Sequence, residues 1–105
     1  MIRAIDLPKN DELYLYSNPI KAQKRAFMYL GKKAVLYKPR NVNKKYAIIT
    51  PEGKIINFGQ IGYEDFTKHK DKLRRKNYLT RTLGMRGDWK NNPYSANNLS
   101  RNILW

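Results

Sequence analysis

The segment from Lys68 to Arg81 combines basic, amide and aromatic side chains at helical spacing. Residues three, four and seven positions apart share one face of a helix, and here these residues are Arg74, Asn77, Tyr78 and Arg81. Such a face could clasp a phosphate backbone, with the Tyr78 ring against a sugar or a base. In the alternative, Tyr78 packs inward and the arginines cap carbonyls or pair with Glu64 and Asp65. The sequence leaves both interpretations open.

The same region holds the residues that most resemble catalytic groups. His69 is the only histidine, and one histidine makes neither a catalytic triad nor a three-ligand metal site. Glu64, Asp65 and Asp71 could in principle bind Mg²⁺ in a small nuclease, but the surrounding lysines compete as counterions. We therefore expect a protein that is not an enzyme, with no catalytic residue, no metal ligand and no cofactor.

Charge is the dominant feature of the composition. The 105 residues include 22 Lys and Arg against 8 Asp and Glu, which gives a net charge of +14. Self-repulsion at that charge destabilises a small domain, so an anionic partner is expected. Nucleic acid, anionic lipid and acidic protein surfaces are the candidate partners. The alternative to a binding surface is a solvated basic surface that only keeps the protein soluble.

The basic residues occur in two blocks. No acidic residue lies between Leu13 and Pro51, and a second block runs from Lys68 to Lys90. The predicted anion-binding residues are Lys21, Lys24, Arg25, Lys32, Lys33, Lys44, Lys45, Lys68, Lys70, Arg74, Arg75, Arg81 and Arg86. Lysine outnumbers arginine in the first block, which favours phosphate contact without recognition of sequence. No zinc finger, RNA-binding aromatic strand or heptad pattern is present.

Composition also limits the class of protein. The chain has no cysteine, which excludes disulfides, thiolate zinc sites and cysteine nucleophiles. We expect neither a signal peptide nor a membrane span, because no apolar run is long enough. These features predict a soluble intracellular protein, or one packed inside an assembly that is made in the cell.

The clearest structural pattern is a β-hairpin. Two apolar runs, 46–49 and 55–58, flank a turn in which Pro51 presets φ and Gly53 can take a positive φ. A short strand is predicted at 33–38, ended by Pro39. The predicted fold is a single α+β domain over 1–105, with a small antiparallel sheet centred on the 46–58 hairpin and two or three short helices.

Two helices are predicted around this hairpin. The first covers 19–30, with Ser17 or Asn18 as its cap and Gly31 at its exit. Its predicted apolar face holds Ile20, Phe27 and Leu30, joined at the edges by Ala26 and Met28. The second covers about 70–83, with Asp71 or Thr67 as its cap and Gly84 at its exit. The residues before the first helix look extended, since Leu13 and Leu15 alternate with Tyr14 and Tyr16. A last short helix could begin at Ser95.

The last residues of the chain are unusually apolar for a tail. They include Trp89 and Tyr94 and close on Ile103, Leu104 and Trp105. Together with Tyr78, these aromatic residues either complete the core or fit the surface of a partner. We favour the core, with Trp105 packed near the hairpin, because the second helix has little apolar area of its own.

From about residue 45 onward, the sequence resembles a group of small basic proteins of nucleocytoplasmic large DNA viruses, including the algal and giant viruses. The shared pattern is a hairpin ending in FG, then DFTxHKDxxRRxNYLxR, a Trp in a short loop, and YSANxxSRxxLW. The matching residues are Phe58, Gly59, Asp65, Phe66, Thr67, His69, Lys70, Asp71, Arg74, Arg75, Asn77, Tyr78, Arg81, Trp89, Tyr94, Ser95, Ala96, Asn97, Ser100, Arg101, Leu104 and Trp105. Residues 1–44, which hold the extended segment, the first helix and the first strand, lie outside the pattern.

The resemblance implies a viral setting rather than an activity. Small basic virion proteins either neutralise packaged DNA or cement capsid and core components. The expectation is a virion protein made in the cytoplasm or nucleus of the host cell, with other virion proteins as partners. A minor capsid or cement role on an anionic surface is the first hypothesis. Sequence-independent DNA binding that helps to package the genome is the alternative.

Overall fold

The predicted hairpin forms the centre of the fold. The computed structural model describes all residues from Met1 to Trp105. Strands β2 (Lys44–Ile49) and β3 (Ile55–Gln60) pair antiparallel, with Tyr46 opposite Phe58 and Ile48 opposite Ile56. Gly53 takes a φ of 87° in the turn, a value that glycine adopts without a steric penalty. The α+β class is confirmed.

A third, very short strand completes the sheet, in the order β1-β2-β3. Strand β1 (Leu36–Tyr37) is shorter than the predicted 33–38. The reason lies in Gln23, which comes from a helix. Its amide donates to the carbonyl of Ala34 and accepts from the N–H of Leu36, at 2.7 and 2.8 Å. This side chain satisfies main-chain groups that a longer strand would have paired with the sheet.

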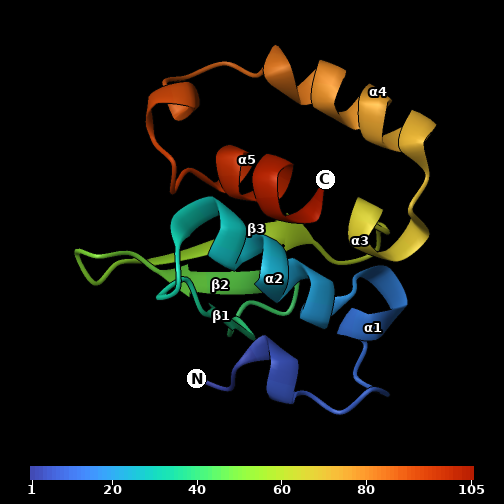
Figure 1. Ribbon diagram of the computed structural model, residues 1–105, viewed down its shortest axis with the longest axis vertical. Helices are drawn as coiled ribbons and strands as arrows, with labels where there is room; N and C mark the ends of the chain where they lie inside the picture. Colours follow the sequence, from blue (N-terminus) through green and yellow to red (C-terminus); the bar gives the residue numbers. More distant parts are fainter.

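The longer helices and the C-terminal segment lie in two tiers over the sheet, whereas the N-terminal helical turns lie below it in the view of Figure 1. Helix α2 (Pro19–Leu30) packs along the last helical segment, which is made of α5 (Ala96–Leu99) and a π-helical turn (η3, Ser100–Leu104). Helix α4 (Lys72–Leu83) lies further out, beyond that segment. No helix is long and apolar enough to cross a membrane.

Helix α2 has the predicted bounds but buries a different face. The Asn18 side chain accepts from the N–H of Lys21, which confirms one of the two predicted caps. Ile20 and Phe27, predicted for the core, are 49% and 40% exposed. Ala26, predicted at one edge of the face, is fully buried together with Ala22, whereas Met28 at the other edge is 86% exposed. Small side chains let the C-terminal segment approach α2 closely, which the spacing of large apolar residues did not reveal.

The prediction of an extended N-terminal segment is wrong. Residues Ala4–Asp6 form a 3-10 turn (η1) and Leu13–Tyr16 form a short helix, α1. The Asp11 carboxylate accepts from the N–H of Leu13 at 3.0 Å and so favours the helical turn. Leu13 is 3% exposed and Leu15 61%. Their alternation with tyrosines therefore does not reflect two faces of a strand.

Aspartates begin both helical segments that follow the sheet. Asp65 caps the single turn α3 (Phe66–His69), accepting from the N–H of Thr67. Asp71 caps α4 by accepting from the N–H groups of Leu73 and Arg74. The predicted cap of α4 is confirmed, and the alternative, Thr67, belongs to the interior of α3. A short turn, η2 (Trp89–Asn91), connects α4 to the last segment.

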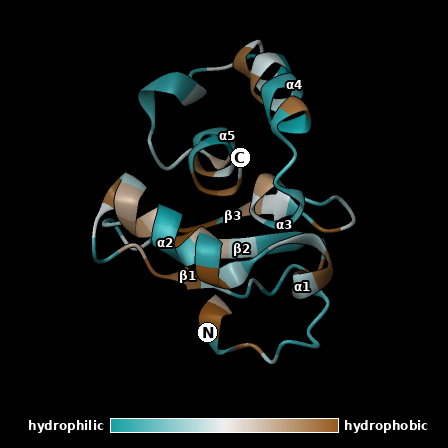
Figure 2. Cartoon of the chain, turned by 45° about the vertical axis from the view of Figure 1, so that its right-hand side comes forward, coloured by the Kyte–Doolittle hydropathy of each residue, from teal (hydrophilic) through white to brown (hydrophobic).

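The C-terminal segment supplies a large part of the core. Ser95 caps it by accepting from the N–H of Asn98, as predicted. Ile103 is fully buried, Leu104 is 1% exposed and Trp105 is 9% exposed. Figure 2 shows the apolar side of this segment turned towards β3, whereas α4 is mostly hydrophilic. The apolar tail is thus part of the protein's own core.

Leu104 is the tail residue that closes onto the hairpin. Gly59 in β3 has a φ of 79°, and a Cβ atom there would lie 2.9 Å from Leu104 Cδ1 and 3.0 Å from Lys45 Cβ. A side chain at Gly59 would hold the tail away from the sheet. Trp105, which we predicted near the hairpin, makes its ring contacts with Tyr78 and His69.

Replacing Leu104 with alanine tests the role of the tail. Leu104→Ala should lower the free energy of unfolding by about 2–5 kcal/mol, because it removes a buried side chain and leaves a cavity. Leu15→Ala makes the same chemical change at an exposed position and should have little effect. Thermal unfolding followed by circular dichroism measures both, and equal losses in the two variants would contradict a core role for the tail.

Candidate functional site

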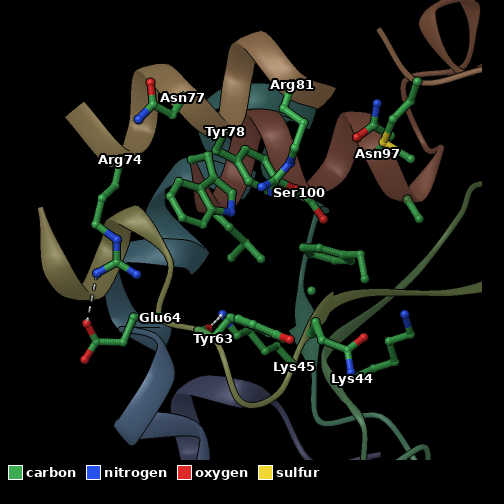
Figure 3. A pocket seen from close by; sticks show the side chains of 17 residues that line it. Lys44, Lys45, Tyr63, Glu64, Arg74, Asn77, Tyr78, Arg81, Asn97 and Ser100 are labelled. Carbon is green, nitrogen blue, oxygen red and sulfur yellow. Dashed lines mark hydrogen bonds and ion pairs between the residues drawn. The ribbon is translucent and has the colours of Figure 1, made fainter. Parts of the chain in front are cut away.

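A groove of about 710 Å³ lies between α4, the loop after β3 and the C-terminal segment. Figure 3 shows α4 as one wall and the loop with Tyr63 and Glu64 as the opposite wall. Asn97 and Ser100 close one side. Its volume is in the range of small-molecule binding sites, which is about 300–1,000 Å³.

The α4 wall carries the four residues whose spacing suggested a shared face. Arg74, Asn77, Tyr78 and Arg81 all line the groove. Tyr78 also stacks on Trp105, with ring centroids 4.1 Å apart and an angle of 9° between the planes. The guanidinium carbon of Arg81 lies 5.5 Å from the centre of the Tyr78 ring. The structural interpretation therefore holds for Tyr78, and phosphate binding by this face stays a prediction.

Only one carboxylate faces these arginines across the groove. Arg74 Nη1 lies 3.7 Å from Glu64 Oε1, and the two side chains are 50% and 41% exposed. Exposed pairs of this kind contribute little to stability. Arg81 and Lys44 line the same groove without a carboxylate partner.

Lys45 is the clearest correction to the predicted anion-binding set. Its side chain is 3% exposed and its ammonium lies 3.1 Å from Asp65 Oδ2, a carboxylate with no exposure. It also donates to the main-chain oxygens of Tyr63 and Tyr16, at 2.5 and 3.3 Å. Burial lowers the pKa of Lys45, and the charge of Asp65 opposes that shift. All three ammonium donors are occupied, so Lys45 is a structural residue.

The Lys45–Asp65 pair is the centre of a larger buried network. Asp65 accepts from the hydroxyl of Thr67 as well as from its N–H. Ser17 Oγ lies 3.1 Å from Thr67 Oγ1 and 2.7 Å from the hydroxyl of Tyr46. Burial raises the pKa of Tyr46 well above its usual value, so this phenol stays protonated. The network joins α1, β2 and α3.

The possible catalytic residues are used structurally. Asp65 belongs to the buried network, Asp71 caps α4, and Glu64 faces Arg74. His69 Nδ1 accepts from the N–H of Asp71 at 2.8 Å. No cluster of three or more His, Cys, Asp or Glu side chains that could hold a metal ion is present.

Two further predicted anion-binding residues also have structural contacts. Arg75 donates to the main-chain oxygen of Trp105 and lies over the Phe66 ring at 5.2 Å. Arg25 is partly buried, and burial, followed by the charge of Arg75, lowers its pKa. The remaining predicted bases are exposed but lie outside the groove lining; they are Lys21, Lys24, Lys32, Lys33, Lys68, Lys70 and Arg86.

Among the predicted core or partner aromatics, Trp89 is buried at 9% exposure and Tyr94 packs partly buried against the core. The Trp89 indole donates to the carbonyl of Met85 at 2.8 Å, and Arg101 lies over the ring at 5.5 Å. With Trp105 also buried, these aromatics serve the fold of the chain itself.

Tyr63 lies in the groove but was not among the predicted site residues. This side chain is 69% exposed and lines the groove. Gly62 precedes it with a φ of 104°, so the chain turns sharply there. The signal in the sequence was an aromatic residue between a glycine and two acids, directly after a strand.

Comparison with known proteins yields one match. Residues 34–82 match a family described as a family of unknown function (DUF5754). The matched segment runs from just before β1 almost to the end of α4 and includes the Lys45–Asp65 pair. No curated protein and no solved structure matches the chain.

The buried pair predicts a large effect of removing one charge. Asp65→Asn leaves the Lys45 ammonium buried without a counterion, which should cost about 3–5 kcal/mol of unfolding free energy. Asp6→Asn is the matched control, because Asp6 pairs with Arg3 in the open, at side-chain exposures of 50% and 53%. Urea unfolding should show a much lower midpoint for Asp65→Asn alone. Similar midpoints for the two variants would contradict a structural role for the pair.

His69 predicts a dependence of stability on pH. Burial, followed by the charge of Arg74, lowers the pKa of His69 in the folded state. The unfolded chain therefore binds this proton more readily, so stability falls as pH drops below about 6.5. His69→Asn can still accept from Asp71 but does not titrate. Unfolding midpoints of the wild type should fall between pH 7 and pH 5, and the variant should lose that slope. A slope unchanged by the substitution would assign the effect to other groups.

Proposed function

We propose that this protein is a non-enzymatic, virion-associated protein that binds nucleic acid without recognising its sequence. The groove face between α4 and the loop after β3 is the proposed contact surface. The observation that carries the proposal is the amount of positive charge left without a partner inside the chain. Of 22 basic residues, only Arg3, Lys38, Lys45 and Arg74 lie within ion-pair distance of a carboxylate.

Phosphate is the anion that fits this pattern best. Arg81 and Lys44 have no carboxylate within ion-pair distance, and the amide side chains of Asn77 and Asn97 also line the groove. Arginine, lysine and amide groups are common donors to phosphate oxygens, and such contacts position a protein without reading bases.

A minor capsid or cement role is the second candidate, and it rests on the resemblance to small basic virion proteins. In one form of that role, the aromatic tail would fit the surface of a neighbouring virion protein. Ile103, Leu104 and Trp105 are already buried in this chain. A cement role would have to use the basic surface instead, which weakens it relative to nucleic-acid binding.

The salt dependence of binding tests the proposed function. Binding of a fluorescent DNA oligonucleotide should weaken linearly on a log–log plot against salt, with a slope of about −0.9 for each phosphate contacted. Arg81→Ala and Lys44→Ala should each reduce that slope by about one. Lys9→Ala removes an exposed charge outside the groove and should leave the slope unchanged. Absence of DNA binding at low salt, with stoichiometric co-purification on capsid shells, would favour the cement role.

A further inference from the structure

The groove has chemically different walls. The α4 wall presents the guanidinium groups of Arg74 and Arg81, and the opposite wall presents the exposed phenol ring of Tyr63 (Figure 3). The other large aromatics of the groove, Phe58, Tyr78 and Trp105, are each in contact with another ring. Tyr63 makes no such contact with a ring or a cation, so both faces of its ring lack a stacking partner.

The main chain that carries Tyr63 is held in place. Its carbonyl oxygen accepts from the buried ammonium of Lys45 at 2.5 Å, and Asp65, two residues on, donates its N–H to the Tyr16 carbonyl at 3.0 Å. The fold therefore anchors the backbone of this loop while leaving the ring outside the core. An exposed aromatic on a fixed backbone is a ready platform for another flat group, since little conformational entropy is lost on stacking.

Glu64 lies where a ligand anion would contact Arg74. Glu64 Oε1 lies 3.7 Å from Arg74 Nη1. This distance is longer than a normal hydrogen bond. Both side chains are about half exposed. A phosphate would make a stronger, bidentate contact with the same guanidinium group. A phosphate that binds the Arg74 guanidinium therefore has to displace the Glu64 carboxylate.

We propose that the groove binds a single strand of nucleic acid, with an unpaired base stacked on Tyr63 and the adjoining phosphates on Arg74 and Arg81. The proposal rests on the proposed function and adds a preference for single strands over duplexes. Bases in a duplex are already stacked and paired, so their faces are not available to Tyr63. Base–aromatic stacking tolerates any sequence, because every base has a π face. Stacking of this kind fits a protein that binds nucleic acid without recognising its sequence.

The test compares single-stranded and double-stranded oligonucleotides of one length with the full chain at matched salt. Fluorescence anisotropy should show the single strand bound at least about tenfold more tightly. Tyr63→Leu should remove about tenfold of single-strand affinity and leave duplex affinity unchanged. Tyr63→Phe keeps the ring and should retain binding. Phe27→Ala, an exposed aromatic outside the groove, is the control. A single-stranded RNA run in parallel shows which sugar the groove prefers.

The carboxylate gives an independent arm of the test. Glu64→Gln should tighten single-strand binding more than Glu52→Gln, which makes the same change in net charge in the hairpin turn, away from the groove. Equal gains in the two variants would mean that only net charge matters and would overturn the role of Glu64.

The outcomes separate this proposal from the proposed function. Equal affinity for single strands and duplexes, unchanged by Tyr63→Leu, would overturn single-strand binding and leave general nucleic-acid binding intact. No binding of either form at low salt would overturn both. Tight single-strand binding that is lost in Tyr63→Leu and kept in Tyr63→Phe supports the assignment of the groove.

Discussion

The buried pair of Lys45 and Asp65 is the interaction on which the rest of the molecule depends. Two charges taken out of water carry a desolvation cost of several kcal/mol each, and their attraction offsets it only when further hydrogen bonds complete the site. Here the lysine also binds two main-chain oxygens, and the aspartate also holds Thr67. The pair thereby fixes the end of α1, the loop after β3 and the start of α3 at one point of β2. The loop that forms one groove wall owes its position to this point.

The protein divides its basic residues between two tasks. Some cations make hydrogen bonds within the fold. Lys45 donates to carbonyls in the interior, and Arg75 donates to the main-chain oxygen of Trp105. Arg101 donates to the Leu79 carbonyl and the Thr82 hydroxyl, both at 2.6 Å. Others remain outside with no acidic neighbour. This division explains how a chain with a net charge of +14 still folds. Hydrogen bonds compensate the cations that are packed against the core, and solvent and salt screen the cations that stay exposed.

Features encoded by neighbouring residues could be read from the sequence. The Pro51–Gly53 turn specifies the hairpin, and Asn18, Asp71 and Ser95 begin their helices through contacts within three residues. Features that depend on distant segments could not. The burial of Lys45 requires Asp65, which is 20 positions away, and a lysine in a basic block looks like a surface residue.

The face of α2 is the second example of this limit. It is decided by the C-terminal segment packing on Ala22 and Ala26, not by the large residues of the helix itself. The α4 face that lines the groove was predicted, because helical periodicity places its residues together. It was missed on the loop side, where Tyr63 is placed by a tertiary contact.

Helix α4 is attached to the molecule along a narrow strip. Tyr78 stacks on Trp105, Arg101 and Asn97 bind carbonyls near its end, and only Thr82 among its residues is buried. In its first turns, residues 72–77 are exposed, although Arg75 donates to the main-chain oxygen of Trp105 and Arg74 faces Glu64. A helix with so few buried contacts opens locally at a lower free energy than the sheet does. One wall of the groove is therefore held firmly and the other can yield, so the width of the cleft can change without disturbing the core.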